Sequence, residues 1–424
     1  MFYHFFYFPL GTEDQNRSRP WVTWGLLAAM VGVHLYLRFV SPESVPSWVL
    51  RTDAPYLSQA LTACFVHGNW FHLITNLLFL WTFGPALEDR VGALAFLGFY
   101  LAGGLVAMGC QVEAIQFFRP EAPPIGVLGA SGSVAAVLGL FWVRCSFLRI
   151  RVGHATMALI QGVTKAGITP IPGWLLCLGW VLTQVIYTLI TESHGSGGTA
   201  YWAHLGGLVF GLLLGFVTPL YRQGRREKVL WRARRFLVQG KFHRSLDQTE
   251  SYCHRYGLDG DALRIQARSL QLLGMAGEAE SAYAKAFEVS MREGDWDEAL
   301  AIEQECSRMK PPPAVDVRLL FALAEELEAE GEVMDALRLF ERAGNTPGML
   351  MVSVKAFERA GDLACFSLGD LDRAASLYLE AATQLETADE PVVSSDERIR
   401  TLRRRSVECR RRLEKATTNM LPAT

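Results

Sequence analysis

Six stretches in the first half of the chain are apolar and long enough to cross a lipid bilayer, and they restrict the fold most. A membrane-spanning helix needs about 20 mostly apolar residues. By this criterion the sequence predicts spans at Trp21–Val40, Trp70–Leu87, Val91–Cys110, Ser131–Phe147, Gly173–Ile190 and Ala200–Leu220. Charge follows the same division, because 15 charged residues lie in residues 21–220 and 65 in residues 221–424. The two halves are therefore expected to occupy different solvents, lipid and water.

The expected fold class is all-α, with a six-helix membrane bundle followed by a water-exposed helical domain. We expect a cytoplasmic segment at residues 1–20, the membrane domain at 21–220, a cytoplasmic helical-repeat domain at 221–415 and a flexible tail at 416–424. The apolar start, MFYHFFYFPL, is too short to span a bilayer. It is expected to lie at the membrane surface or to pack beside the first span.

The loops between the spans predict the orientation of the chain. Lys and Arg accumulate in cytoplasmic loops, and here they gather before the first span and after the fourth and sixth, for example at Arg19, Arg149 and Arg225. Both termini are therefore expected in the cytoplasm. The simple six-span layout, without a transit-like N-terminus, favours a bacterial inner (plasma) membrane.

A phrase led by glycine recurs in the second half. Similar segments, such as GDWDEALAIEQE and GEVMDALRLFER, start at Gly240, Gly277, Gly294, Gly331 and Gly369. This spacing resembles stacked helical hairpins of the tetratricopeptide type, in which small residues such as Ala299, Ala336 and Ala374 let paired helices approach. The full signature is absent and KPPPAV interrupts the register, so a compact helical bundle is the alternative. The expected partner of a repeat array is a protein or peptide.

The composition argues against several other kinds of site. Eight cysteines contain no C-x-x-C pair, so neither a disulfide framework nor a zinc cluster is expected. The net charge of −2 says little, because the distribution of charge along the chain matters more than its sum. The basic stretch ERIRTLRRRSVECRRRLEK is expected to form a solvated capping helix rather than to bind lipid or nucleic acid. No cofactor, metal or nucleic acid is therefore expected.

Polar residues inside three of the predicted spans indicate chemistry. His72 and Asn76 are four residues apart in the second span and so share one helical face. The fourth span begins at Ser131, and His204 lies near the start of the sixth. Ionisable residues inside spans are costly and usually functional. With the N-terminus inside, these three spans all start at the outer face, so the four side chains are expected at similar depth.

The glycines near these positions have a simpler explanation. Small residues let membrane helices pack closely, and taken alone this explanation would also cover Ser131. It applies to Gly129, Gly132, Gly139, Gly207, Gly211 and Gly215.

The four polar residues suit acyl transfer. A serine hydroxyl becomes a good nucleophile when a neighbouring base takes its proton, and His204 is the base available to Ser131. The N–H of Ser131 at a helix start, together with His72 and Asn76, can supply donors to an oxyanion. No Asp or Glu in the spans is placed to orient the histidine, so we expect a dyad. A zinc site of His67, His72 and His204 is the alternative, but H-E-x-x-H is absent.

At these residues the sequence resembles the rhomboid family of intramembrane serine proteases, over roughly the first 220 residues. The resemblance rests on HGNWFHLITNLLFLWTFGPALEDRVG, GASGS, IPGWLLCLGWVLTQ and YWAHLGGLVFG, in the family's order. It implies Ser131 as nucleophile, His204 as general base and acid, and His72 and Asn76 as oxyanion donors. It also implies cleavage of transmembrane segments of other membrane proteins near the outer face. The SHGSGG loop before His204 would then be a mobile cap.

The sequence departs from the family pattern at two places. Ala135 stands where many relatives have an aromatic residue that supports the histidine ring, and Trp48 and Arg51 are farther apart than the family's Trp-Arg pair. We expect an active serine endopeptidase whose cytoplasmic domain binds a partner or regulates access. The alternative is a catalytically silent relative that binds and escorts membrane proteins, although such relatives usually lose the serine or histidine kept here.

Overall fold

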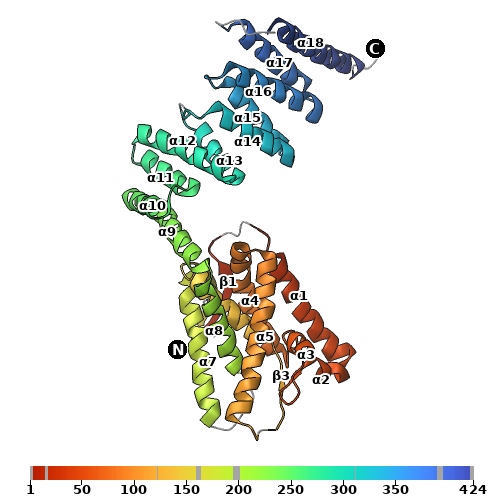
Figure 1. The fold of residues 1–424 in the computed structure, drawn as a ribbon, viewed down its shortest axis with the longest axis vertical. Coiled ribbons are helices and arrows are strands. Elements are labelled where there is room, and N and C mark those ends of the chain that lie inside the picture. The colour runs from red at the N-terminus through yellow and green to blue at the C-terminus, as the bar shows by residue number, and fades with distance from the viewer. Residues whose placement is uncertain are drawn as a thin grey trace. The chain divides into compact units, whose positions relative to one another are not determined.

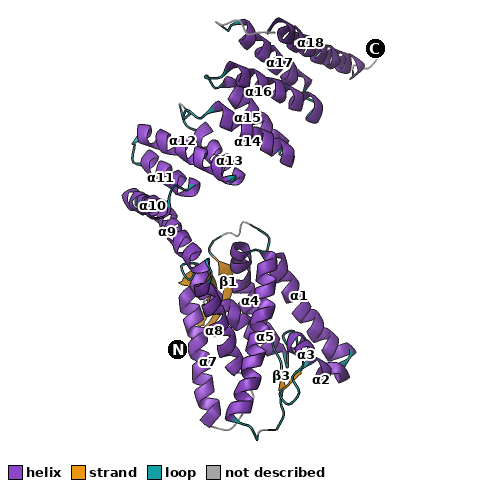
Figure 2. Ribbon diagram, in the orientation of Figure 1, coloured by secondary structure: helices purple, strands orange, loops and turns teal. Residues whose placement is uncertain are grey.

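The structure, a computed structural model, describes residues 3–14, 18–121, 123–158, 164–193, 201–310, 312–388 and 395–420. The chain divides into two compact units, Met1–Lys228 and Val229–Thr424, whose elements are labelled in Figure 1. The predicted helical fold class is confirmed. In the described part of the chain, strands occur only in the first unit (Figure 2).

Each of the six predicted spans corresponds to a helix of the first unit. These are α1 (Trp21–Leu35) with the π-helix η1 (Tyr36–Val40), α4 (Trp70–Val91), α5 (Ala93–Phe118), α6 (Ser131–Cys145), α7 (Gly173–Ser193) and α8 (Tyr201–Val217). Of the described helices, α1 with η1, α4 and α5 are long and apolar enough to cross a membrane alone. A fourth span results if α8 and α9 (Leu220–Val238), bent by 77°, count as one. The apolar helix α6 and the apolar part of α7 are shorter.

Short elements connect these helices. The 3₁₀ helix η2 (Pro42–Ser44), α2 (Val45–Trp48) and α3 (Leu57–Ala63) lie between α1 and α4. Strand β2 (Leu50–Arg51) pairs antiparallel with β3 (Gly126–Val127), which precedes α6. This pairing fixes the backbone that leads into Ser131.

Helix α6 forms the centre of the first unit. All its residues except Ser131 and Trp142 are buried, and it packs against α4, α5, α7 and α8. Helix α8 approaches so closely that a Cβ on Gly207 or Gly211 would collide with a backbone carbonyl of α6. Small residues permit this close approach in membranes. The α6–α8 contact therefore determines where His204 lies relative to Ser131.

A carboxylate from the end of α4 holds the start of α1. Glu88 is 2% exposed and accepts hydrogen bonds from the N–H of Val22 at 2.8 Å and from the N–H of Thr23 at 2.7 Å. The Thr23 hydroxyl donates a third bond at 2.7 Å. The first N–H groups of a helix have no intrahelical partners, so Glu88 caps α1 and ties the first predicted span to the second.

A three-stranded antiparallel sheet is the main feature that the sequence analysis did not predict. Its strands are β1 (Tyr3–Thr12), β4 (Arg149–Ala158) and β5 (Thr164–Pro172), in the order β1-β4-β5. Strand β1 also packs against α4. The apolar N-terminal segment, expected at the membrane surface or beside the first span, is thus a strand paired with a segment about 150 residues away.

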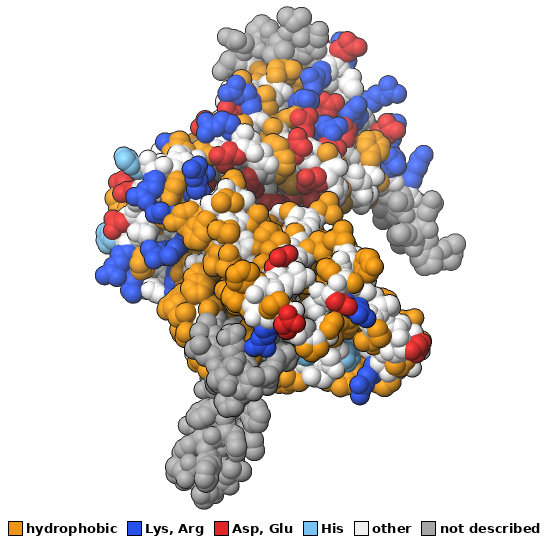
Figure 3. Space-filling view, turned by 60° about the horizontal axis from the view of Figure 1, so that its bottom comes forward, with side chains coloured by type: hydrophobic (Ala, Val, Ile, Leu, Met, Phe, Trp, Pro, Cys, Tyr) orange, Lys and Arg blue, Asp and Glu red, His pale blue; other side chains and the backbone are white. Residues whose placement is uncertain are grey.

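Apolar side chains cover much of the first unit's described surface. Leu94, Phe117 and Val217 are 85%, 79% and 80% exposed. In Figure 3 such side chains form a broad surface with few charges among them. Exposed apolar surface of this extent indicates contact with a membrane, and the protein is a multi-pass membrane protein.

The second unit contains the rest of α9 and nine further α-helices among its described residues. These are α10 (Phe242–Tyr256), α11 (Gly260–Leu272), α12 (Ala276–Glu293), α13 (Trp296–Ser307), α14 (Val317–Glu330), α15 (Val333–Asn345), α16 (Leu350–Asp362), α17 (Leu371–Glu386) and α18 (Ser395–Met420), with the π-helix η3 (Leu363–Ser367) after α16. Most helices pack against their neighbours in sequence. Helix α18 extends to Met420, into the segment expected to be a flexible tail.

The glycines of the repeated phrase mark turns between helices, with one correction. Gly240, Gly294, Gly331 and Gly369 have φ between +68° and +87°, a conformation that glycine adopts readily. Gly277 instead lies inside the first turn of α12, and Gly274 makes the preceding turn with φ of +79°. The small residues Ala299, Ala336 and Ala374 are fully buried. Whether these hairpins are repeats of the tetratricopeptide type stays a prediction.

Candidate active site

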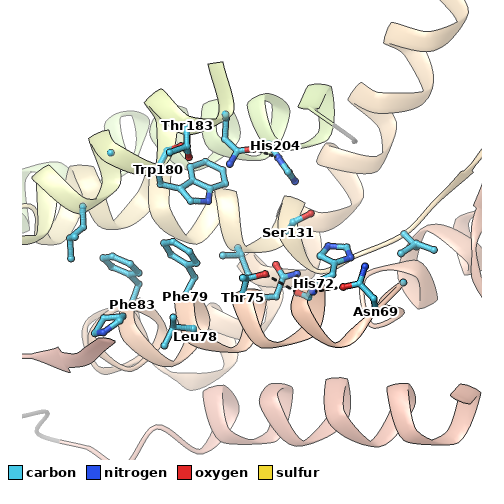
Figure 4. A pocket seen from close by; sticks show the side chains of 18 of the residues that line it. Asn69, His72, Thr75, Leu78, Phe79, Phe83, Ser131, Trp180, Thr183 and His204 are labelled. Atoms are coloured by element: carbon cyan, nitrogen blue, oxygen red, sulfur yellow. Dashed lines mark hydrogen bonds between the residues drawn. The ribbon is translucent and has the colours of Figure 1, made fainter. Parts of the chain in front are cut away.

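A cavity of about 950 Å³ lies in the first unit, lined mainly by residues of α4, α6, α7 and α8. Its lining includes all four residues singled out from the sequence: His72, Asn76, Ser131 and His204. Figure 4 shows Ser131 between His204 on one side and His72 on the other. The structure therefore brings these residues, from three different helices, to one opening.

Ser131 owes its position to the backbone that precedes it. It is the first residue of α6, so its N–H is among those that a helix leaves without an intrahelical partner. Gly129, two residues earlier, has φ of +122°, where an L side chain is strained. A Cβ there would lie 2.7 Å from His72 Cε1 and 3.5 Å from Ser131 Oγ. The missing side chain leaves room for the His72 ring beside the Ser131 hydroxyl.

The start of α4 holds His72 and Asn76 on the cavity side. Asn69 caps this helix, because its side-chain oxygen accepts the N–H of His72 at 2.8 Å. Asn76 donates one N–H of its side-chain amide to the His72 carbonyl at 2.8 Å. An amide nitrogen carries two donors, so the second N–H of Asn76 remains to serve the cavity.

His67 packs against His72 and is not among the residues that line the cavity. Its ring stands edge-on to that of His72, with centroids 5.2 Å apart, and its Nδ1 is 3.1 Å from the Phe65 carbonyl. Within the described ranges, no group of three His, Cys, Asp or Glu side chains has the arrangement of a metal site. The position of His67 fits a histidine that supports the neighbouring His72.

His204 lies in the first turn of α8 and is 9% exposed. Its Nδ1 is 2.6 Å from the Oε1 atom of Gln184 on α7. The described residues include no hydrogen bond between Ser131 and His204, although both side chains face the same opening (Figure 4). Catalytic hydrogen bonds are often long in unliganded enzymes and shorten when substrate binds.

Two residues near His204 were missed in the sequence analysis. Gln184 contacts the ring nitrogen, and Trp180 lies with its ring centroid 5.7 Å from that of His204. Trp180 and Tyr201, at 6.4 Å, surround the ring where Ala135, fully buried on α6, offers no aromatic surface. A neutral side chain, rather than Asp or Glu, therefore contacts the histidine here. A glutamine in the apolar run GWVLTQVIY was a signal available in the sequence, because buried polar groups in membranes need partners.

Two further features of the sequence, the SHGSGG loop and Arg51, do not contribute described residues to the cavity lining. Residues 194–198 of the SHGSGG loop, expected to form a mobile cap, lie outside the described residues. Arg51 pairs with Asp53 at 2.7 Å in the loop after β2, outside the cavity lining.

Comparison with families of known proteins gives one finding. Residues 54–220 match the family model described as Rhomboid domain. The matched segment runs from just before α3 to the start of α9 and contains His72, Asn76, Ser131 and His204.

Proposed function

The membrane unit of this chain belongs to the rhomboid family, whose members are generally intramembrane serine proteases, and on that premise we propose that the protein is itself an active serine endopeptidase. It hydrolyses peptide bonds in or beside transmembrane segments of other membrane proteins. One observation supports this proposal above all. A serine at a helix start and a buried histidine line the same cavity, with His72 and Asn76 on a third helix beside them.

Ser131 and His204 carry the covalent chemistry. His204 uses Nε2 as the base, because Gln184 occupies Nδ1. It removes the proton from Ser131 Oγ while the oxygen attacks the carbonyl carbon of the scissile bond. The resulting imidazolium gives this proton to the leaving amine as the C–N bond breaks. A water deprotonated by His204 then hydrolyses the ester at Ser131 and regenerates the hydroxyl.

The negative oxygen of each tetrahedral intermediate is stabilised by donors along the cavity wall. The Ser131 N–H points along the α6 axis, where the helix dipole adds positive potential. The His72 ring lies beside Ser131 (Figure 4), and Asn76, one turn further along α4, lines the same cavity with a second amide N–H. Loss of one such donor typically lowers kcat by about 100- to 1000-fold.

The proposal extends to the substrate class and to the orientation of the protein. Substrates are transmembrane proteins that reach the cavity from the bilayer, near the outer face. Both termini lie in the cytoplasm, and the simple layout of spans favours a bacterial inner membrane. The cytoplasmic domain at residues 221–415 consists of tetratricopeptide-like repeats and binds a protein or peptide that regulates or supplies substrate.

Cleavage of a single-span reporter in liposomes tests the proposal. Ser131→Ala and His204→Ala are compared with wild type and with two controls, Ser146→Ala at the other end of α6 and His243→Ala on the surface of the second unit. We expect cleavage by wild type and both controls and none by the two site variants. Cleavage that survives either site substitution contradicts the dyad. No cleavage by wild type favours the silent relative that escorts membrane proteins.

A further inference from the structure

We propose that Gln184 is a positioning residue for His204, which holds the imidazole in the tautomer that presents the Nε2 lone pair to Ser131. This inference deepens the proposed function and rests on it, because it assigns a role within the same site. It goes beyond a two-residue dyad, since it adds a third side chain that acts through the histidine.

The geometry sets Gln184 against Nδ1 of the His204 ring, which leaves Nε2 for Ser131. Gln184 lies on α7 and His204 on α8, and Oε1 is 2.6 Å from Nδ1. Both residues line the cavity. Figure 4 shows His204 close to Ser131. The Gln184 contact therefore links the helix that carries the base to a neighbouring helix.

The chemistry of the two groups decides which atom carries the proton. A neutral imidazole has one N–H donor and one acceptor nitrogen, whereas a carbonyl oxygen can only accept. With Oε1 facing Nδ1, the N–H must be on Nδ1, and Nε2 keeps its lone pair. The opposite tautomer would set two acceptors against each other and would leave Nε2 unable to take the serine proton.

A neutral amide suits this role in a membrane unit. In soluble serine proteases a carboxylate orients the histidine and also stabilises the imidazolium. A charged side chain inside the bilayer is costly. Glutamine supplies the accepting oxygen without that cost, so it fixes the tautomer but adds no ionic stabilisation.

Other contacts hold His204 without touching its ring nitrogens. Trp180 lies four residues before Gln184 and so on the same face of α7, and its ring packs beside the imidazole. Gln111 on α5 accepts the N–H of Ala203 at 3.1 Å, which anchors the start of α8. These contacts determine where the ring lies, whereas Gln184 determines which nitrogen carries the proton.

Steady-state kinetics with the full-length protein test this role. Gln184→Met has a similar shape but no accepting oxygen, and Gln184→Glu keeps one. Leu182→Ala, on the exposed side of α7 and outside the cavity lining, is the control. We expect Gln184→Met to lower kcat about 10-fold with KM unchanged, as for the loss of one hydrogen bond. Gln184→Glu should recover most of that loss, and the control should match wild type.

Two kinetic results would overturn the proposal. Wild-type kcat in Gln184→Met means that the hydrogen bond does not contribute to catalysis. Equal losses in Gln184→Met and Gln184→Glu mean that the amide group is needed for something other than its accepting oxygen. A rise in KM without a change in kcat would assign Gln184 to substrate binding instead.

Nitrogen-15 NMR of histidine-labelled protein supplies a readout that needs no substrate. We expect His204 to carry its proton on Nδ1 in wild type and in Gln184→Glu, and to lose this preference in Gln184→Met. A proton on Nε2 in wild type contradicts the inference. Ser131→Ala, assayed in parallel, distinguishes a failure of the proposed function from a failure of the Gln184 inference. Undiminished cleavage by Ser131→Ala refutes the proposed function. The NMR result still decides whether Gln184 sets the tautomer of His204.

Discussion

At the scale of single residues, the site depends on side chains that are absent as much as on those present. The missing Cβ of Gly129 admits the His72 ring beside Ser131, and the missing Cβ atoms of Gly207 and Gly211 let α8 touch α6. From the sequence, close helix packing was the expected role of these glycines. The structure shows that at Gly129 packing and site geometry coincide, because the neighbour is a proposed oxyanion donor.

Gly129→Ala is expected to lower cleavage at least 10-fold. The new Cβ would lie 2.7 Å from His72 Cε1, and φ of +122° adds backbone strain of about 1–3 kcal/mol. The His72 ring must then move away from the serine. Gly109→Ala on α5, where a Cβ meets nothing within 4 Å, is the matched control. Reporter cleavage by Gly129→Ala at the wild-type rate would show that His72 does not need this position.

At the scale of elements, hydropathy predicted the helices of the membrane unit, because helix formation depends on local sequence. All six apolar runs are helices, and Ser131 and His204 lie near the starts of theirs. The sheet was missed, since β1 pairs with β4 across most of the membrane unit and no local period reports such pairing. Gln184 was missed for a related reason, because its partner lies on another helix. Contacts between distant segments are what the sequence alone did not reveal.

Glu88→Ala is expected to destabilise the first unit by about 2–4 kcal/mol, because three donors at the start of α1, two of them buried, lose their acceptor. Thermal unfolding in detergent measures this change. Glu113→Ala, which removes an exposed carboxylate of α5, is the control. Equal midpoints for the two variants would mean that the α1 cap contributes little to stability.

Helix α13 carries a carboxyl group whose titration links the second unit to pH. Burial raises the pKa of Glu298 to about 7 from its usual 4.5, although Arg264 opposes the shift. The folded state therefore holds this proton more tightly than the unfolded state. Its contribution to the free energy of unfolding increases as pH falls through 7 and levels off below 4.5.

Hydrogen exchange of α13 at several pH values checks this sign. Between pH ~8 and ~5.5, protection in wild type relative to Glu298→Gln should increase by about 1–2 kcal/mol, because only wild type gains the proton. Comparison at each pH cancels intrinsic exchange. Ser307→Ala, which changes no titratable group, should show no such trend. A constant difference between wild type and Glu298→Gln would refute the raised pKa.

At the scale of the whole molecule, the candidate site lies in one of the two units. Every residue that lines the cavity belongs to the first unit. Within that unit, Glu227 in the first half of α9 pairs with Arg90 of α4 and, at 2.6 Å, with Arg144 of α6. The membrane unit therefore has its own core, its own cavity and ion pairs that join α9 to α4 and α6. The second unit has a separate helical core.

A chain that ends at Lys228 is expected to cleave a generic reporter within about threefold of the full-length rate, because domains with their own core fold independently. The same truncation should change cleavage of a natural substrate if the second unit supplies or regulates it. Loss of reporter cleavage in a folded truncated chain would show that the second unit contributes to catalysis itself.

Covalent labelling of the serine tests the central claim most directly. The full-length protein in detergent is treated with a fluorophosphonate, which reacts with activated serines, and the modified residue is identified by peptide mass spectrometry. We expect one modification, at Ser131, and its loss in His204→Ala while Ser146→Ala labels normally. An unlabelled Ser131 in folded wild-type protein, or labelling that persists without His204, would contradict a Ser131–His204 protease.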